Sequence, residues 1–412
     1  MSVVIIGGGQ AGIQVADSLR SEGYAESITV VAEEAGLPYQ RPPLSKDYLA
    51  PGKEPSPLPL RGLGFFTDKG IRLLTGVSAT AVDRSARSIA LSDGTALPYG
   101  HLVLATGARN RTLVCPGAEL AGIHGLRTLA DARALHAALP AARHVVVIGA
   151  GFIGLEFAAA ARAHGCHTTV LEYEPRPMAR ALSPVMGAWF ANAHRALGVD
   201  LRLSEGIERF EADDDGHVAA AVSTSGERYR ADLVVTGVGV LPNEMLAAVA
   251  GLETDNGIVV DAALRTADPH VLAVGDCASF PNAHAGAHTR LESVQNATDQ
   301  ARHAARTVLG AADPYTALPW FWSTQGPYRL QMAGLARPDD DVLVLGDPSA
   351  AKFSVLCFRD GVLAAVESVN MPADHIAART LLGTGAQITR TEADVEGFSL
   401  KTAAKASARI PA

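Results

Sequence analysis

A glycine-rich loop near the start of the chain has the spacing that binds the pyrophosphate of a dinucleotide. Its glycines occupy the first, third and sixth positions: Gly7, Gly9 and Gly12. The apolar run Val3–Ile6 precedes the loop, and Ile13–Arg20 has helical spacing, so the loop joins a predicted strand to a predicted helix. There the first glycine permits a tight turn, the second admits the pyrophosphate, and the third lets helix and strand pack closely. The positive end of the helix dipole would face the phosphates.

An acidic residue after the next strand would complete this binding unit by accepting hydrogen bonds from a ribose diol. Ser27–Ala32 is the next apolar run, and Glu33 and Glu34 follow it. We expect Glu33 to be the ribose ligand because it lies directly at the strand end, and Glu34 remains the alternative.

A second loop repeats the first with the same spacing. Its glycines are Gly149, Gly151 and Gly154, between the predicted strand Val145–Ile148 and the predicted helix Leu155–His164. Glu172 ends the following strand. A carboxylate there would repel the 2′-phosphate of NADPH and favours NADH. Arg176 and Arg180 lie nearby, so this preference could also be weakened.

These two units, 142 residues apart, indicate an internal duplication of a dinucleotide-binding half. We predict an α/β fold with two Rossmann-like domains and a small α+β C-terminal domain. The predicted segments are 1–108 and 237–316 for the first nucleotide, 109–236 for the second, and 317–412 for the last domain. Leu104–Gly107 and Gly275-Asp276 each close a predicted strand. The polar tail after about Lys401 is a candidate for disorder.

Taken with these loops, three further segments resemble the FAD-dependent ferredoxin reductases of bacterial oxygenase systems. This group includes putidaredoxin reductase, biphenyl-dioxygenase reductase and rubredoxin reductase. The three segments are Pro38–Lys46, Glu292–Ala297 and Pro319–Gln325, and the resemblance runs from Val3 to about Leu382. It implies a glutathione-reductase-like fold, with FAD at the first loop and NADH at the second.

The resemblance also implies roles for residues by position. The implied FAD contacts are Gly7, Gly9, Ala11, Gly12, Glu33, Arg41, Lys46, Ala79, Arg127, Asp276, Val294 and Trp320. The implied NADH contacts are Gly149, Gly151, Gly154, Glu172 and Gly239. Lys46 and Glu156 would form an ion pair beside the flavin N5, as the catalytic residues, and Trp320 and Trp322 would lie near the ring edge where electrons leave.

Simpler interpretations of these last residues stay open. Lys46 could be a solvated lysine, whereas a cation near the ring would stabilise reduced, anionic flavin. Glu156 could be a first-turn acid that stabilises the helix dipole. Trp320 and Trp322 could equally anchor the core of the last domain, because large aromatic side chains dominate packing.

The cysteines and histidines exclude several classes of site. The four cysteines, Cys115, Cys166, Cys277 and Cys357, form no CxxC or CxxxxC pair, which argues against a disulfide reductase. Cys277 is expected to serve packing. The thirteen histidines show no metal-binding spacing, so we predict no metal.

Composition and charge limit the partners and the location. Apolar residues form 48% of the 412-residue chain, which can therefore bury several cores. The net charge of −8, without dense runs of lysine and arginine, gives no reason to expect nucleic-acid binding. No apolar segment is long enough to span a membrane, and Val3–Ile6 lacks the flanks of a signal peptide. We expect a cytoplasmic protein, as a monomer or weak dimer.

The expected activity is hydride transfer from NADH to FAD, followed by single-electron transfer to a 2Fe–2S ferredoxin that serves an oxygenase or a cytochrome P450. Two alternatives share the architecture. One is a redox-responsive binding protein of the apoptosis-inducing-factor branch, and the other is a small-molecule reductase similar to monodehydroascorbate reductase.

Overall fold

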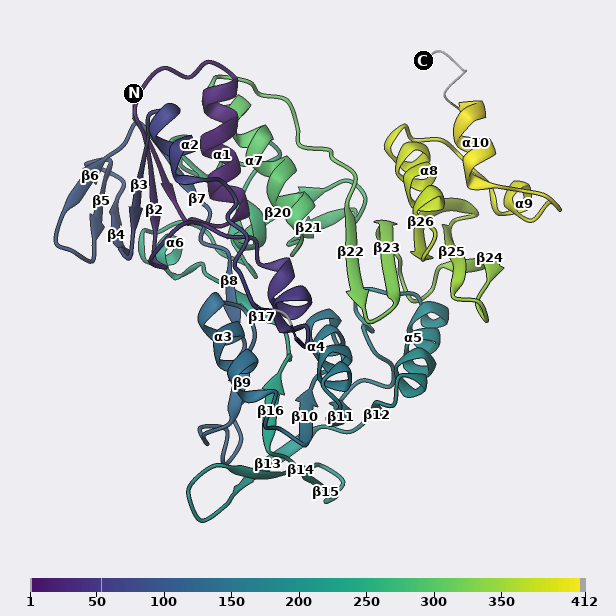
Figure 1. The fold of residues 1–412 in the computed structure, drawn as a ribbon. Coiled ribbons are helices and arrows are strands. Elements are labelled where there is room, and N and C mark those ends of the chain that lie inside the picture. The colour runs from purple at the N-terminus through teal and green to yellow at the C-terminus, as the bar shows by residue number, and fades with distance from the viewer. Residues whose placement is uncertain (1, 53, 408–412) are drawn as a thin grey trace. The chain divides into compact units, whose positions relative to one another are not determined.

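The computed structural model describes residues 2–52 and 54–407, and its internal contacts divide the chain into two compact units (Figure 1). Unit 1 comprises Met1–Gln40, Leu58–Arg109 and Val240–Ala317. Unit 2 comprises Arg41–Pro57, Asn110–Gly239 and Leu318–Ala412. The predicted domain boundaries near residues 108, 236 and 316 stay a prediction.

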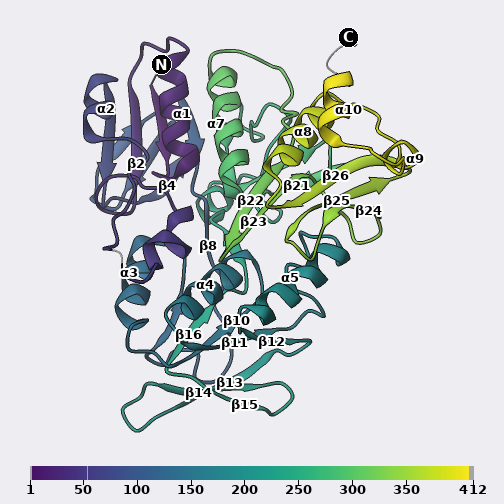
Figure 2. The same ribbon diagram turned by 45° about the vertical axis from the view of Figure 1, so that its right-hand side comes forward.

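Unit 1 is built on a five-stranded parallel sheet with the order β19-β7-β1-β2-β3. The strands are β1 (Val3–Ile6), β2 (Ile28–Ala32), β3 (Ile71–Thr75), β7 (His101–Leu104) and β19 (Val271–Ala273). The central strand β1 is wholly apolar and buried, as is typical of a parallel strand that is covered on both faces. Helices α1 (Gln10–Ser21) and α7 (Val294–Val308) pack side by side, as Figures 1 and 2 both show.

Smaller elements complete unit 1. A three-stranded antiparallel sheet includes the tight turn at Ser92–Thr95. Its strands are β4 (Ala79–Asp83), β5 (Ser88–Leu91) and β6 (Ala96–Pro98). The other elements are α2 (Leu63–Asp68), β17 (Val240–Pro242), α6 (Met245–Val249), β18 (Ile258–Val259), the short helix η3 (Gly275–Cys277), β20 (Ala278–Asn282) and β21 (Ala287–Thr289). Strand β8 (Ala108–Asn110) spans the boundary between the segments that end at Arg109 and begin at Asn110.

Unit 2 contains a second parallel sheet with the order β12-β11-β10-β16-β9. Its strands are β9 (Ile123–Gly125), β10 (His144–Ile148), β11 (His167–Glu172), β12 (Asp200–Leu203) and β16 (Leu233–Thr236). Strands β1, β2 and β3 lie side by side in the first sheet, and β10, β11 and β12 lie in the same order in the second. The predicted duplication is therefore present in the topology. The remaining elements here are η1 (Pro42–Ser45), η2 (Asp47–Leu49), α3 (Leu129–Ala138), α4 (Phe152–Ala163), α5 (Pro184–Ala196), β13 (Ile207–Ala212), β14 (Val218–Ser223) and β15 (Arg228–Arg230).

The C-terminal part of unit 2 is an antiparallel sheet with the order β22-β23-β26-β25-β24. Its strands are β22 (Trp320–Gln325), β23 (Tyr328–Gly334), β24 (Asp341–Asp347), β25 (Lys352–Arg359) and β26 (Val362–Val369). The helices are α8 (Pro372–Gly383), α9 (Arg390–Ala393) and α10 (Leu400–Ser407). The two parallel sheets and this α+β region confirm the predicted fold class.

Disorder after Lys401 was a wrong expectation for the residues that the structure describes. Helix α10 runs through Ser407, and residues 408–412 lie outside the described part. Leu400 is buried in the same cluster as Leu381, and Ala403 and Ala404 pack against it. Alanine has a high helix propensity, so a small polar composition did not prevent a docked helix.

A buried carboxyl group joins the C-terminal sheet to α5. Glu367 in β26 is 1% exposed and accepts hydrogen bonds from the backbone N–H and the hydroxyl of Ser183, at 2.8 and 2.5 Å. Burial raises the pKa of Glu367 to about 7, while the bonds from Ser183 and the charge of Arg176 act in the opposite direction. The charge of Asp340 adds to the rise.

This buried group makes stability depend on pH. Between pH 4.5 and about 7 the unfolded chain has an ionised Glu367 while the folded chain keeps its proton, so stability falls as the pH rises through this window. Glu367→Gln keeps the shape but cannot ionise. We expect its melting temperature to rise relative to the parent protein across this window, equivalent to at most about 3 kcal/mol by pH 8.

The measurement is thermal unfolding at several pH values, with the exposed Glu396→Gln as the control. A constant difference between Glu367→Gln and the parent protein from pH 5 to 8 would contradict a raised pKa.

No helix in residues 2–52 and 54–407 has the length and apolar character needed to cross a membrane.

Candidate functional site

The first glycine loop has two closely packed glycines and one that faces open space. A Cβ on Gly7 would lie 2.0 Å from the carbonyl oxygen of Ala105, and one on Gly12 would lie 1.9 Å from that of Gly7. Around the Cβ direction of Gly9, however, nothing lies within 4 Å. Gly9 is also the N-cap of α1, and no side chain caps that helix end. The loop thus leaves room and unbonded N–H groups where a pyrophosphate is expected.

The second glycine loop is constructed in the same way. A Cβ on Gly149 would lie 2.6 Å from the carbonyl oxygen of Gly237, and one on Gly154 would lie 2.1 Å from that of Gly149. Gly151 has only one atom near its Cβ direction, at 3.8 Å, and it is the N-cap of α4 without a side-chain cap. Both loops therefore fit a dinucleotide by the same test, an open position at the middle glycine.

Because the middle glycine has open space around it, a side chain can be added there to test binding without disturbing the fold. Gly9 has φ −82° and ψ −168°, a conformation open to any residue. Gly9→Val should therefore fold normally, but its side chain would occupy the pyrophosphate space. We expect affinity for FAD to fall by about tenfold or more, which corresponds to about 1.4 kcal/mol.

Gly62 offers a matched control for Gly9. It is also an extended N-cap, of α2, with no side-chain cap and nothing within 4 Å of its Cβ direction. The measurement is flavin content and FAD titration of both valine variants. Equal flavin binding by Gly9→Val and Gly62→Val would remove Gly9 from the cofactor site.

The acids after the two sheets' second strands differ in their contacts. Glu172 ends β11, and its carboxylate accepts the backbone N–H groups of Ala150 at 2.6 Å and Glu174 at 2.9 Å. It therefore contacts the second glycine loop directly. In unit 1, Glu33 follows β2 and is exposed, whereas Glu34 accepts the hydroxyl of Tyr39 at 2.5 Å.

The register of the two loops shows that these acids are not equivalent positions. The N–H of Gly7 donates to the carbonyl of Val31, and that of Gly149 donates to Leu171, both at 2.8 Å. By this register the counterpart of Glu172 is Ala32, and Glu33 lies one residue further along. Assignment of Glu33 to the ribose stays a prediction.

Other predicted FAD contacts of unit 1 lie around its glycine loop. Ala11 in α1 borders Gly275, whose added Cβ would lie 3.0 Å from the Ala11 Cβ, so Asp276 follows a residue packed against α1. Val294 is the first residue of α7, the helix that packs on α1. Ala79 begins β4, and Val77 just before it donates to the carbonyl of Ala32 at the end of β2.

Lys46 and Glu156 form the predicted ion pair. The Lys46 Nζ lies 2.6 Å from Glu156 Oε2 and also donates to the carbonyl of Pro42 at 3.1 Å. The Glu156 side chain is 2% exposed and that of Lys46 is 20% exposed. Glu156 is therefore a buried, paired acid. Its interpretation as a first-turn acid was wrong, because α4 begins at Phe152 and has no acidic residue in its first turn.

Two serines that the sequence analysis missed complete this pair. Ser45 donates to Glu156 Oε2 at 2.5 Å, and Ser323 donates to Oε1 at 2.6 Å. Ser323 is 167 residues from Glu156 in sequence, so no local pattern reveals the contact. A weak signal was present, because both serines lie in segments that carried the family resemblance.

Two arginines also meet in unit 2. The Arg41 Nη1 donates to the carbonyl of Arg127 at 2.7 Å. The Arg127 N–H donates to Asp131 at 2.9 Å, beside the capping box of α3. These predicted FAD contacts are therefore held together through the backbone at the start of α3.

Trp320 is partly buried against α8. Its ring centroid lies 5.6 Å from that of Trp322 and 5.5 Å from that of His375, and the Arg379 guanidinium lies over it at 4.1 Å. Burial, with Arg379 and Arg329 nearby, lowers the pKa of His375 to about 4, so the ring is neutral at pH 7. Packing explains much of this cluster, and a place near the flavin edge stays a prediction.

Gly239, the last predicted NADH contact, is far from the second loop in sequence but follows a segment that packs against it. It follows Gly237, whose carbonyl borders Gly149, and it has φ +94°, which favours glycine. An added Cβ would lie 3.3 Å from an Arg180 nitrogen. Gly239 also accepts the backbone N–H of Arg111 at 3.0 Å.

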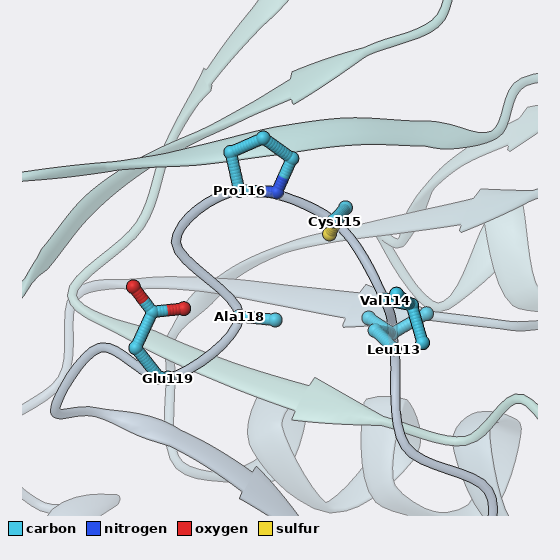
Figure 3. Close-up of a pocket in the computed structure, with 6 residues that line it drawn as sticks. All are labelled: Leu113, Val114, Cys115, Pro116, Ala118 and Glu119. Carbon is cyan, nitrogen blue, oxygen red and sulfur yellow. The ribbon is translucent and has the colours of Figure 1, made fainter.

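A surface hollow elsewhere in unit 2 contains none of the predicted residues. Figure 3 shows its lining: Leu113, Val114, Cys115, Pro116, Ala118 and Glu119. Val114 is 99% exposed, and all six residues belong to one loop. We assign no chemistry to it.

All four cysteines are free thiols. Cys277 is fully buried, its sulfur donates to the carbonyl of Val274 at 3.3 Å, and burial raises its pKa. These properties fit packing. Within the described residues, no cluster of three or more His, Cys, Asp or Glu side chains could hold a metal ion.

Comparison with known proteins identifies the family. The model of the pyridine nucleotide-disulphide oxidoreductases matches residues 1–301, and that of the reductase C-terminal domain matches residues 320–404. The chain belongs to the pyridine nucleotide-disulphide oxidoreductase family. Within that family it is 50% identical over 403 residues to rhodocoxin reductase of Rhodococcus erythropolis, covering 98% of this chain and 94% of the relative.

Two further relatives of this oxidoreductase family extend the comparison. Putidaredoxin reductase of Pseudomonas putida is 40% identical over 385 residues, covering 92% of this chain and 91% of the relative. A ferredoxin reductase from Rhodopseudomonas palustris has a solved structure with a TM-score of 0.95 and 46% identity, covering 98% of this chain and 99% of that one. The putidaredoxin reductase–putidaredoxin complex matches with a TM-score of 0.95 and 37% identity, over 99% of both chains. The predicted oxidoreductase family is confirmed.

Proposed function

We propose that this chain is an FAD-dependent NADH:ferredoxin reductase that supplies an oxygenase or a cytochrome P450. The observation that carries the proposal is the pair of glycine loops, each with an open middle position at an uncapped helix start. The relatives named above are reductases of small electron carriers, and they resemble this chain over nearly its whole length.

In this proposal the two glycine loops bind the nucleotides, and the Lys46–Glu156 ion pair stabilises the reduced flavin. Bound FAD would accept a hydride from NADH and release its electrons singly. Gly9 and Gly151 would admit the two pyrophosphates, and the starts of α1 and α4 would stabilise their charge. Lys46, held by Glu156, would supply positive charge toward the reduced flavin and stabilise it electrostatically. The family supports binding of both FAD and NAD(H), and we propose that FAD binds at the first loop and NADH at the second.

The contacts around Glu172 favour NADH over NADPH. The Glu172 carboxylate would repel a 2′-phosphate at this position, and Arg176 is not free to neutralise that phosphate. The Arg176 guanidinium already donates to the carbonyls of Leu182 and Ala179, both at 2.7 Å. These two bonds restrain the Arg176 side chain, which would lose them if it turned toward a 2′-phosphate.

The cysteines favour an external electron acceptor. Cys166, Cys277 and Cys357 are buried, and all four thiols are free, so no internal disulfide stands ready to take electrons. A 2Fe–2S ferredoxin is the acceptor we propose. A cytoplasmic location, in keeping with free thiols, and a monomer or weak dimer complete this proposal.

Anaerobic stopped-flow mixing tests the proposal. NADH should bleach the absorbance band of the oxidised flavin rapidly, and the reduced protein should then reduce a 2Fe–2S ferredoxin. A protein that binds FAD but is reduced by neither NADH nor NADPH would contradict the activity. Fast reduction of a small quinone together with no reduction of any ferredoxin would instead favour a small-molecule reductase.

A further inference from the structure

The carboxylate of Glu156 receives hydrogen bonds from three side chains in two segments of unit 2. Lys46 and Ser45, in the loop that holds η1, donate to Oε2, while Ser323 in β22 donates to Oε1 at 2.6 Å. Ser45 is 3% exposed and Ser323 is 0% exposed. One acid on α4 therefore joins the lysine loop to the first strand of the C-terminal sheet.

A second layer of buried polar groups lies behind Ser323. The amide nitrogen of Gln325 is 3.2 Å from the Ser323 hydroxyl and 3.4 Å from the sulfur of Met178. The amide oxygen of Gln325 is 2.8 Å from Nε2 of His194 in α5. Both Gln325 and His194 are 0% exposed. The chain of contacts thus runs from α5 through β22 to Glu156 and ends at Lys46.

The chemistry of these groups fixes the direction of every hydrogen bond. Because the Met178 thioether has no proton, only the amide nitrogen of Gln325 can make a favourable bond on that side. Its oxygen must then accept from His194, whose pKa is lowered by burial despite the bond to Gln325, so the ring is neutral. Since Gln325 donates to Ser323, the single hydroxyl proton of Ser323 points at Glu156.

The hydrogen bonds from His194, Gln325 and Ser323 therefore run in one direction and end at the Glu156 carboxylate, which Ser45 and Lys46 also bond. A buried carboxylate that receives several donors is held in one orientation, and removal of one donor leaves an oxygen unsatisfied. The Lys46 side chain is 20% exposed, and its ammonium group lies 2.6 Å from Glu156 Oε2. The orientation of the Glu156 carboxylate therefore determines where this ammonium group is held.

We infer that Ser323, supported by Gln325, is a positioning residue that orients Glu156 and through it Lys46. This inference rests on the proposed function, in which the Lys46 ammonium stabilises reduced flavin. By this inference β22, the first strand of the C-terminal domain, helps to position the Lys46 ammonium group. This role is separate from any contact between that domain and an electron carrier.

The test compares Ser323→Ala with Ser354→Ala. Ser354 is also 0% exposed and hydrogen-bonded, to Ser368 and Asp374 in the same C-terminal region, but it has no contact with Glu156. Both variants lose a buried hydroxyl, so both should be destabilised similarly. Only Ser323→Ala is expected to slow NADH-driven flavin reduction, by about tenfold, at unchanged flavin content.

Two readouts besides turnover separate positioning from structure. The flavin midpoint potential should become more negative in Ser323→Ala, because the cation that stabilises the reduced form is held less well. Acetylation of Lys46 in the oxidised holoenzyme, followed by mass spectrometry, should become severalfold faster because its amine is less restrained. In Ser354→Ala both quantities should match the parent protein.

A double variant decides whether Ser323 acts through Glu156. In a Glu156→Gln background, Ser323→Ala should cause little further change in rate or potential, because the acid it orients is gone. Additive effects, or equal behaviour of Ser323→Ala and Ser354→Ala, would overturn the inference while parent-protein reduction by NADH left the proposed function intact. A parent protein that NADH does not reduce would instead overturn the proposed function.

Discussion

Replacement of Lys46 by methionine is expected to slow flavin reduction by NADH about 100-fold, the range found when one charge-stabilising donor is removed from a reaction site. Methionine keeps an unbranched side chain of similar length, so the packing of the loop changes little. The flavin content should stay within about twofold of the parent protein, because in the proposed assignment the first glycine loop, and not Lys46, binds the pyrophosphate of FAD.

The buried partner complicates a single substitution and suggests a better one. Without Lys46, the Glu156 carboxylate would be buried and unpaired, which costs about 3–5 kcal/mol in comparable cases. Lys46→Met with Glu156→Gln removes both charges together. If the cation is the active feature, the double variant should be as slow as Lys46→Met but more stable.

The measurements are stopped-flow reduction, flavin content and thermal unfolding. Lys352→Met, at an exposed lysine of the same unit, is the control and should behave like the parent protein. Loss of rate and flavin in equal proportion would make Lys46 a structural residue of the cofactor site.

Replacement of Glu172 is expected to change the choice between nicotinamide cofactors. For Glu172→Arg, the ratio of kcat/KM for NADH to that for NADPH should fall about 100-fold, because repulsion of the 2′-phosphate is replaced by attraction and the ribose loses its acceptor. The hydride-transfer rate at saturating cofactor should change much less, since in the proposed assignment Glu172 contacts the ribose and not the nicotinamide.

Glu172 also has a structural role in the glycine loop, and a conservative variant can separate that role from its charge. It accepts the N–H of Ala150 within the glycine loop at 2.6 Å. Glu172→Gln keeps an oxygen for that bond but removes the charge, so it should lower the NADH to NADPH ratio by about tenfold without disturbing the loop.

Glu174→Gln, at the exposed acid two residues further on, is the matched control and should leave the ratio unchanged. The ratio is measured from steady-state kinetics with both cofactors at one ionic strength. An unchanged ratio in both Glu172 variants would exclude a ribose role for this acid.

Local patterns predicted the parts of the fold that depend on neighbouring residues. Apolar runs and glycine spacing predicted both strand–loop–helix units, with helix starts a few residues later than observed, because α1 begins at Gln10 and α4 at Phe152. The small α+β domain at the C-terminus was predicted as a class. Helix α10 was missed because its stability depends on burial of Leu400, which only the tertiary structure shows.

The candidate site was predictable only as far as its segments carried a known pattern. The Lys46–Glu156 pair followed from resemblance and not from spacing, since 110 residues separate the two. The bonds from Ser323 to Glu156 and from Ser183 to Glu367 join residues 167 and 184 positions apart. Serine is so common in sequences that its type gives no hint of a buried role.

The alternation of the two units along the chain constrains how the protein can be made and divided. Six segments alternate between unit 1 and unit 2, which gives five crossings, so no single cut releases either unit whole. During synthesis, Glu156 cannot acquire its last donor until Ser323 has left the ribosome, long after Lys46. The hydrogen bonds around the Lys46–Glu156 ion pair are therefore completed late in folding. A protein fragment that ends before β22 would leave the Glu156 carboxylate without the hydrogen bond from Ser323.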